Sequence, residues 1–111
     1  MPLITSFIPS EDRLDLSFHG NLDLTSTDEV CRVFAAIPAN LQTCVMDLTQ
    51  LERLFDSGLA LLWMLNERLQ HIGARVVVLS DHPEILSRIQ RFMRNVLGVI
   101  PQDSALGTAV T

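Results

Sequence analysis

Hydrophobic and polar residues alternate strictly in LDLSFHG, residues 14–20. In an extended chain this alternation places two leucines and a phenylalanine on one side, and aspartate, serine and histidine on the other. The segment therefore predicts a half-buried strand. The apolar stretch LITSFI, residues 3–8, predicts another strand, and the turn-forming residues PSED (9–12) separate the two. The start of the chain thus predicts an antiparallel hairpin.

The hydrophobic period changes to that of a helix in LTSTDEVCRVFAAI, residues 24–37. Ser26 with Glu29 three residues later is typical of a capping box at a helix start. The residues PAN, 38–40, end the predicted helix. Spacings of three and four residues place one apolar face on this helix, formed by Val30, Val33, Phe34 and Ile37.

Two further helices follow the same pattern. One is predicted from Ser57 to about Ile72, and Gly73 ends it as a C-terminal glycine. The other is predicted over residues 81–95, with Pro83 in its first turn. Their apolar faces consist of Leu61, Leu62, Leu65, Leu69 and Ile72 in the first, and of Ile85, Leu86, Ile89, Phe92 and Met93 in the second.

Between the helices lie two nearly continuous apolar runs, TCVMDL (43–48) and ARVVVLS (74–80). The former is typical of a central strand with helices on both faces of its sheet. A short edge strand near 98–101 and a fragment of helix are expected in the tail. The order β-β-α-β-α-β-α predicts an α/β fold, in which an N-terminal hairpin joins parallel strands in a mixed sheet covered by helices. With no linker or repeat, residues 1–111 predict one domain.

Composition narrows the range of functions. The net charge is −5, with 13 acids against 8 bases, and every base is arginine. Non-specific nucleic-acid binding needs a basic face, so this acidic balance argues against it. The aromatic content of 5% with no tyrosine also argues against a stacking platform for single strands.

The sequence predicts no cofactor and no metal site. The histidines His19, His71 and His82 are dispersed and have no metal-ligand spacing. Cys31 and Cys44 lie in apolar stretches without CxxC spacing, so we expect two buried thiols. No signal peptide and no apolar run of about 18 residues is present, which predicts a cytoplasmic protein without membrane insertion.

Three segments in order, HGNLDLTS (19–26), VMDLTQLERLFDSGLALL (45–62) and GARVVVLS (73–80), resemble the STAS domain. This is the fold of bacterial anti-sigma-factor antagonists and of the cytoplasmic tails of sulfate transporters. The resemblance extends over nearly the whole chain. It implies a non-enzymatic interaction module, and no convergent catalytic group or glycine-rich phosphate loop supports the competing hypothesis of a small enzyme or nucleotide binder.

Antagonists of this family read D-L-S-x-x-x-x-x-D-S-S-G-L, and a partner kinase phosphorylates the first of the adjacent serines. Counted from Asp47 without a gap, the family's second aspartate is replaced by Phe55 and its phosphorylated serine by Asp56. Ser57 and Gly58 match the remaining two positions. A one-residue deletion is the alternative, and it would place Ser57 at the phosphorylated position. The ungapped count predicts that this chain is not switched by phosphorylation there.

Physical chemistry gives Asp56 a second role that does not depend on the family. A helix N-terminus presents unpaired N–H groups and a partial positive charge, which favour an anion. Aspartate is among the best N-cap residues. We therefore expect the carboxylate of Asp56 to cap the helix that begins near Ser57.

Leu59, Ala60, Trp63 and Met64 form a second apolar region on the first turns of this helix. Trp63 is either an interface anchor or is covered by the first helix and the chain's own loops. In the resembled family, partners dock on this loop and helix start, beside the acid of the G-x-L-D turn. That acid is matched by Asp23, which is equally suited to capping the turn. The expected partner-binding residues are Asp23, Leu54, Phe55, Asp56, Ser57, Gly58, Leu59 and Trp63.

The resemblance implies two classes of partner. The first is an anti-sigma factor or a related histidine-kinase-like ATPase. The alternative is the ATPase of a lipid-transport ABC system, in which a STAS subunit regulates ATP hydrolysis. The sequence also allows a homodimer. Arg88, Arg91 and Arg94 are interpreted as a solvated face, with a docking patch for an acidic partner as the alternative.

Overall fold

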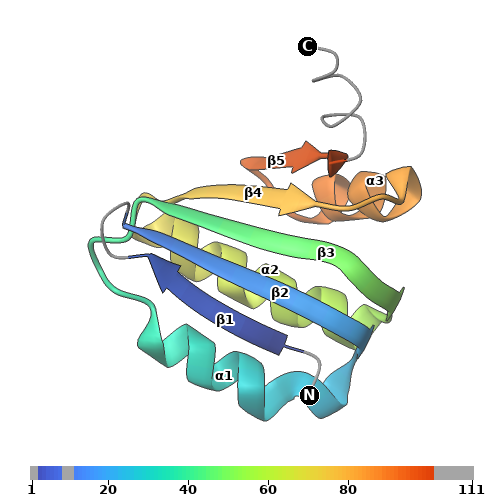
Figure 1. Cartoon of the computed structure of the whole chain (residues 1–111), viewed down its shortest axis with the longest axis horizontal. Helices are drawn as coiled ribbons and strands as arrows, with labels where there is room; N and C mark the ends of the chain where they lie inside the picture. Colours follow the sequence, from blue (N-terminus) through green and yellow to red (C-terminus); the bar gives the residue numbers. More distant parts are fainter. Residues whose placement is uncertain (1–2, 9–11, 102–111) are drawn as a thin grey trace.

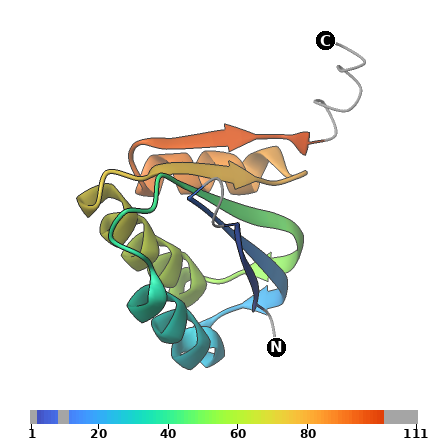
Figure 2. The same ribbon diagram turned by 60° about the vertical axis from the view of Figure 1, so that its left-hand side comes forward.

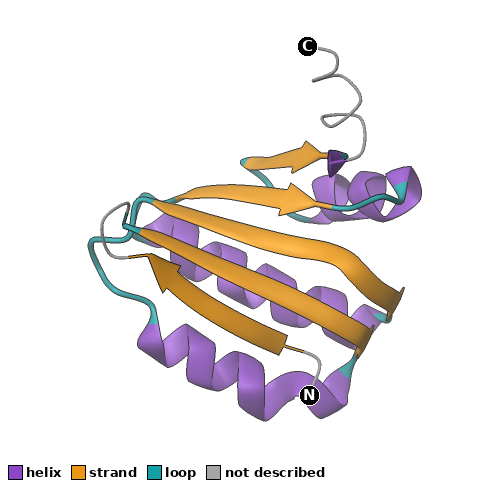
Figure 3. Cartoon of the chain, in the orientation of Figure 1, coloured by secondary structure: helices purple, strands orange, loops and turns teal. Residues whose placement is uncertain are grey.

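The computed structural model describes the backbone of residues 3–8 and 12–101 and the side chains of residues 12–101. Five strands form one sheet in the order β1-β2-β3-β4-β5, as Figure 1 and Figure 3 show. β1 pairs with β2 antiparallel, whereas the pairs β2–β3, β3–β4 and β4–β5 are parallel. The mixed α/β fold with an N-terminal hairpin is therefore confirmed. The elements are β1 (Leu3–Ile8), β2 (Arg13–Leu22), the 3-10 helix η2 (Leu24–Ser26), α1 (Thr27–Ala36), β3 (Thr43–Leu54), α2 (Asp56–His71), β4 (Arg75–Leu79), α3 (Pro83–Phe92) and β5 (Val96–Val99).

β2 has the predicted alternation, because Leu14, Leu16 and Phe18 are buried and the residues between them are half-buried. β3 is twice as long as the predicted segment 43–48, since it stays paired with β2 as far as Leu54. The register between the two strands shifts twice near Gly20, whose φ of 71° favours glycine. These irregularities break the period-two pattern, which is why the sequence did not predict the second half of β3.

All three helices pack on one face of the sheet, and β2 and β3 pass in front of α2 in Figure 1. Figure 2 shows the helices together on the same side. The expectation that helices cover both faces of β3 is therefore wrong. Cys44 and Met46 are fully buried beneath the helices, whereas Val45 and Asp47 between them are half-buried on the opposite face.

α2 supplies most of the helical side of the core. Its predicted stripe is confirmed, because Leu61, Leu62, Leu65 and Leu69 are buried and Ile72 packs against the core. Gly73 follows the helix with a φ of 79°, as expected of a C-terminal glycine.

α3 ends earlier than predicted, at Phe92, whose side chain is 51% exposed and not part of the inner face. The chain turns extended at Met93, and the methionine side chain enters the core in its place. The following turn is attached to α2. The fully buried Asn66 donates to the Arg94 carbonyl at 3.2 Å, and Gln70 donates to the carbonyl of Asn95, a residue with a φ of 59°, also at 3.2 Å.

The predictions for the tail and for the cysteines are only partly confirmed. An edge strand follows α3 as expected, but at Val96–Val99 instead of 98–101. The helix fragment expected in the tail lies outside the described residues. Cys44 is buried, whereas the prediction that Cys31 is buried is wrong, because it lies on the exposed side of α1.

Candidate functional site

The candidate site lies at the edge of the sheet where β2 and β3 end and the chain enters its first two helical segments (Figure 1). The Phe55 N–H donates to the Leu22 carbonyl at 3.1 Å, which joins the two strand ends. Gly58 lies so close to Leu22 that an added Cβ would be 2.6 Å from the Leu22 carbonyl carbon and 2.9 Å from its Cγ. Only glycine permits this approach of α2 to β2. The close contact with Leu22 thus explains why the third residue of the DSG sequence is glycine.

Asp23 occupies the turn between β2 and η2. Its Oδ1 accepts hydrogen bonds from the Thr25 N–H at 2.9 Å and from the Thr25 hydroxyl at 2.5 Å. Both hydrogen bonds lower the pKa of the Asp23 carboxyl from its ordinary value of 3.8. The bond from the Thr25 hydroxyl has the larger effect, and the bond from the Thr25 N–H has the smaller one. Asp23 therefore caps η2, which confirms the expectation that it is suited to capping the turn.

The predicted capping box at Ser26 and Glu29 does not form. Ser26 precedes α1, but its side chain makes no capping hydrogen bond. Among the described residues, Ser26 Oγ and Glu29 Oε1 are buried without a hydrogen-bond partner. The η2 turn, capped by Asp23, leads directly into α1, so the helical geometry begins three residues earlier than a cap at Ser26 requires.

The prediction that Asp56 caps α2 is also wrong. Asp56 is the first residue of the helix, and Phe55 occupies the N-cap position without a side-chain bond to the helix. The carboxylate of Asp56 instead pairs with the Arg88 guanidinium of α3, and it remains 97% exposed. Arg88 also donates from Nη1 to the Leu54 carbonyl at 2.8 Å. The Asp56 carboxylate therefore binds a tertiary partner on α3, and no hydrogen bond joins it to the described N–H groups at the start of its own helix.

Arg88 was predicted to belong to a solvated face together with Arg91 and Arg94. That holds for the latter two, which are exposed, but not for Arg88, which ties α3 to the β3–α2 junction. The sequence did not identify Arg88 as part of the site. Its spacing in α3 is that of an outward residue, and nothing in the chain indicated that this side of α3 faces the start of α2.

Two large exposed apolar side chains precede and follow Asp56 along the chain. Phe55 is 39% exposed and Trp63 is 44% exposed, so the chain's own helices and loops do not cover the tryptophan. Asp56, Ala60 and Trp63 follow one another at intervals of four and three residues, which places them on one stripe of α2. Leu24 at the start of η2 is 70% exposed as well, which its place in the hydrophobic pattern did not predict.

The remaining predicted partner-binding residues lie beneath the exposed ones and are buried or half-buried. Gly58, Leu59 and Leu54 are buried, and Ser57 is half-buried. The structure therefore brings all eight residues to one edge of the molecule, but divides them into exposed residues and supporting ones.

Solved structures with a similar fold include SpoIIAA, an anti-sigma-factor antagonist, in its unphosphorylated form. That structure aligns over 98% of this chain and 99% of its own, with a TM-score of 0.70 and 14% sequence identity. An anti-sigma-factor antagonist from Mycobacterium paratuberculosis aligns over 97% of this chain and 93% of its own, with a TM-score of 0.65 and 22% identity. The chain has the STAS fold.

A sulfate transporter family protein from Wolinella succinogenes also shares this fold, with a TM-score of 0.65, 13% identity and coverage of 88% of this chain and 86% of its own. No protein-family model matches the sequence. No curated protein matches it either. At these identities the likeness to solved structures concerns the STAS fold itself.

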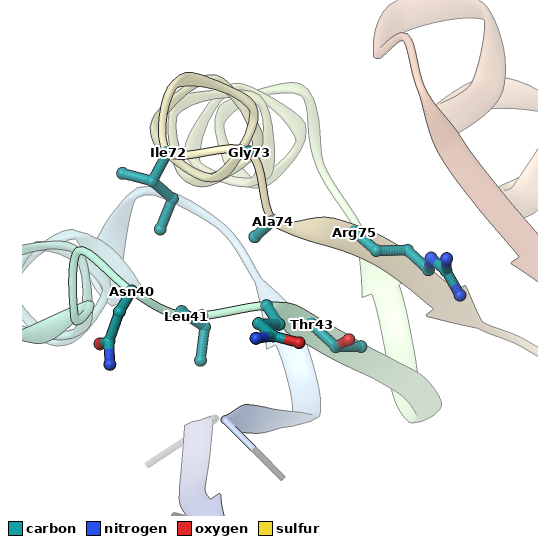
Figure 4. Close-up of a pocket in the computed structure, with 8 residues that line it drawn as sticks. Asn40, Leu41, Thr43, Ile72, Gly73, Ala74 and Arg75 are labelled. Carbon is teal, nitrogen blue, oxygen red and sulfur yellow. The ribbon is translucent and has the colours of Figure 1, made fainter.

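A shallow depression of about 560 Å³ lies at the opposite edge of the STAS sheet (Figure 4). It is bounded by the segments 40–43 and 72–75, and Arg75 is the one titratable side chain that lines it. Within residues 12–101, no three histidine, cysteine, aspartate or glutamate side chains are grouped to hold a metal ion. No helix in the described part of the chain has the length and hydropathy to span a bilayer.

Proposed function

We propose that this chain is a non-enzymatic regulator that binds a protein partner in the manner of an anti-sigma-factor antagonist. The partner is an anti-sigma factor or a related histidine-kinase-like ATPase. One observation carries the proposal: two exposed aromatic side chains, Phe55 at the N-cap of α2 and Trp63 on its second turn, flank the charged Asp56, on a fold shared with SpoIIAA over nearly its whole length.

The exposed and buried residues of the site have different roles in this proposal. Phe55, Trp63 and Leu24 supply apolar contact area, because large exposed side chains that become desolvated carry most of the binding energy in protein interfaces. Asp23, Asp56 and Ser57 form the polar part of the same surface. The buried residues Leu54, Gly58 and Leu59 hold the loop against β2 and α3, so that the exposed side chains keep fixed positions.

Asp56 takes the place of a phosphorylatable serine in this proposal. Gly58 is fixed against Leu22, and residues 56–58 belong to one continuous helix. The position two residues before the glycine is then Asp56, which supports the ungapped alignment with the family pattern. Because a carboxylate has no hydroxyl to modify, phosphorylation at this position does not switch the chain.

Affinity capture with the full chain tests the partner class, and paired phenylalanine variants provide the control. Phe55→Ala removes an exposed phenylalanine inside the site, and Phe92→Ala removes one that is exposed on α3 outside it. We expect Phe55→Ala and Trp63→Ala each to weaken binding of the identified partner by about tenfold or more, whereas Phe92→Ala leaves it unchanged.

The identity of the captured protein decides between the two partner classes. A sigma-regulatory protein or its kinase-like ATPase supports the proposal, and an ABC-transporter ATPase supports the alternative in which the chain regulates transport. Equal binding by the Phe55→Ala, Phe92→Ala and unaltered chains would place the interface elsewhere.

Phosphorylation is tested separately with the partner kinase. We expect Asp56→Ser to become labelled and the unaltered chain to stay unlabelled. Labelling of the unaltered chain at Ser57, as readily as of the variant at position 56, would support the one-residue deletion and overturn the assignment of Asp56.

A further inference from the structure

The face of the sheet opposite the helices carries a band of apolar side chains. Strand register aligns Val45, Val77 and Leu97 in one row across β3, β4 and β5, and Leu79 and Val99 in the next row. Leu97 is 57% exposed, and the other four are half-buried. We call these five residues the apolar band.

Parallel strands are almost always covered on both faces, because their connections pass over the sheet as helices. Here β2 to β5 are parallel, yet all three helices lie on one side (Figure 2). The apolar band therefore lies where other parallel sheets have a second covering layer, and no described residue of this chain provides one.

The charges beside the band indicate what covers it. Arg75 lies on the same face toward the start of β4 and is exposed, and its guanidinium has no hydrogen bond or ion pair within residues 12–101. Asp47 lies at the other end, next to Leu79. Its Oδ1 accepts from the Thr49 N–H and hydroxyl at 2.9 and 2.6 Å, while Oδ2 has no hydrogen bond within the described residues.

A twofold axis that runs across the strands brings these charges together. We place such an axis through the row of Val45, Val77 and Leu97. Each strand of one copy then lies antiparallel over the same strand of the other copy, and the rows on the two sides of the axis exchange places. The row that contains Arg75 in one copy then lies over the row that contains Asp47 in the other. An isologous interface of this kind is self-complementary, with an apolar centre over β3 to β5 and opposite charges at both ends. On β2 the central row continues with Asp15, whose carboxylate is paired with Arg13 of the same copy at 2.7 Å.

We infer that the apolar band is the interface of a homodimer, in which two copies of this chain pack their uncovered sheet faces together and Arg75 of each copy meets Asp47 of the other. This interface faces away from the helices that carry Trp63 and Arg88. Dimerisation and partner binding therefore use different surfaces, and this inference does not depend on the proposed function.

Sedimentation equilibrium of the full chain tests the inference directly. We expect a monomer–dimer equilibrium with a dissociation constant on the order of 1–100 µM, as for a small interface. Leu97→Glu places a charge in the apolar band and is expected to weaken the dimer by about tenfold or more. Leu24→Glu is the matched control, since this leucine is also exposed but lies at the candidate partner site.

Charge reversal tests the relative orientation of the two copies. Arg75→Asp and Asp47→Arg should each weaken the dimer, and the double variant should restore part of the affinity because the opposite charges meet again. Circular dichroism verifies that each variant is folded, and Leu97→Gln replaces Leu97→Glu if the latter unfolds. A chain that stays monomeric at all concentrations, or a Leu24→Glu variant weakened as much as Leu97→Glu, overturns the interface. A double variant without recovery overturns the twofold arrangement.

Discussion

The two helical segments that begin at the candidate site differ in how their first turns are stabilised. The first begins with Asp23, whose carboxylate binds the Thr25 N–H within the same turn. The second begins with Asp56, whose carboxylate binds Arg88, 32 residues away in the sequence. Two aspartates at neighbouring helix starts thus have different partners, one local and one tertiary.

The difference follows from what lies beside each start. Asp23 forms no ion pair within residues 12–101, and its short side chain accepts hydrogen bonds from Thr25 in the same turn. α2 starts beside α3, where Arg88 already donates to the Leu54 carbonyl and presents a second N–H to Asp56. A neighbouring guanidinium therefore determines the orientation of an acid that local rules assign to a cap.

Gly58→Ala should have the largest effect, because it disrupts the packing of α2 on β2 that positions the start of α2. An added methyl group would collide with the Leu22 backbone, and we expect the free energy of unfolding to fall by about 1–3 kcal/mol. Urea denaturation measures the loss. Gly73→Ala is the control, since a Cβ there meets nothing within 4 Å and only the backbone conformation is strained. A loss no greater than that of Gly73→Ala would mean that close packing is not why position 58 is glycine.

Arg88→Gln should have a smaller effect and removes the tertiary partner of Asp56. We expect a loss of about 0.5–1.5 kcal/mol, mainly from the hydrogen bond to the Leu54 carbonyl, because exposed ion pairs contribute little. Asp56→Asn should accordingly cost less than Arg88→Gln, and Arg91→Gln should be neutral. The same denaturation measurement ranks the three variants. Equal losses for Arg88→Gln and Arg91→Gln would contradict the role given to Arg88.

Asp23 should make stability depend on pH. Its pKa is lower in the folded chain than in the unfolded chain, so its contribution is complete above the ordinary value of 3.8 and is lost as the pH falls through the lower, folded value. Asp23→Asn keeps an N-cap side chain but does not titrate in this range. We measure the free energy of unfolding of both chains as the pH is lowered from 5 to below 3.8. We expect the unaltered chain to lose more stability over this range than the variant. Parallel pH profiles would show that this carboxylate is not the cause.

Ser26→Ala should have the smallest effect. A capping serine would lose about 1 kcal/mol on substitution by alanine, but the Ser26 hydroxyl is buried without a partner among the described residues. Removing an unsatisfied hydroxyl is close to neutral or slightly stabilising. Thermal unfolding separates these outcomes, and a loss near that of a true cap would restore the capping box.

The sequence predicted those elements whose pattern depends on local period. The alternation around Leu16, the stripe around Leu65 and the glycine at position 73 each reflect burial on one side of a single element, and all three predictions are confirmed. Contacts between elements were predicted less well. Phe92 lies outside the core because Met93 takes the inner position, and no helical period expresses that change from helix to extended chain.

The candidate site shows the same limit. The motif around Asp56 and the exposure of Trp63 were accessible from sequence, because both depend on spacing along one helix. The pairing with Arg88 and the uncovered face of the sheet were not, since they depend on how far apart in space the elements come to lie. Val45 belongs to a run that reads as doubly buried, and only the arrangement of all three helices on one side leaves it half-exposed.

The two thiols of this chain lie in opposite environments, and chemical labelling can use that contrast. Cys44 is buried at the second position of β3, and this burial raises the pKa of its thiol to about 12, whereas Cys31 is exposed on α1. Because the thiolate is the reactive species, a maleimide should modify Cys31 in the native state and reach Cys44 only when the sheet opens. A fluorophore on Cys31 would then give a single-site reporter on α1, the helix that follows η2. The slow modification of Cys44 would measure the rate at which the core opens in the same sample.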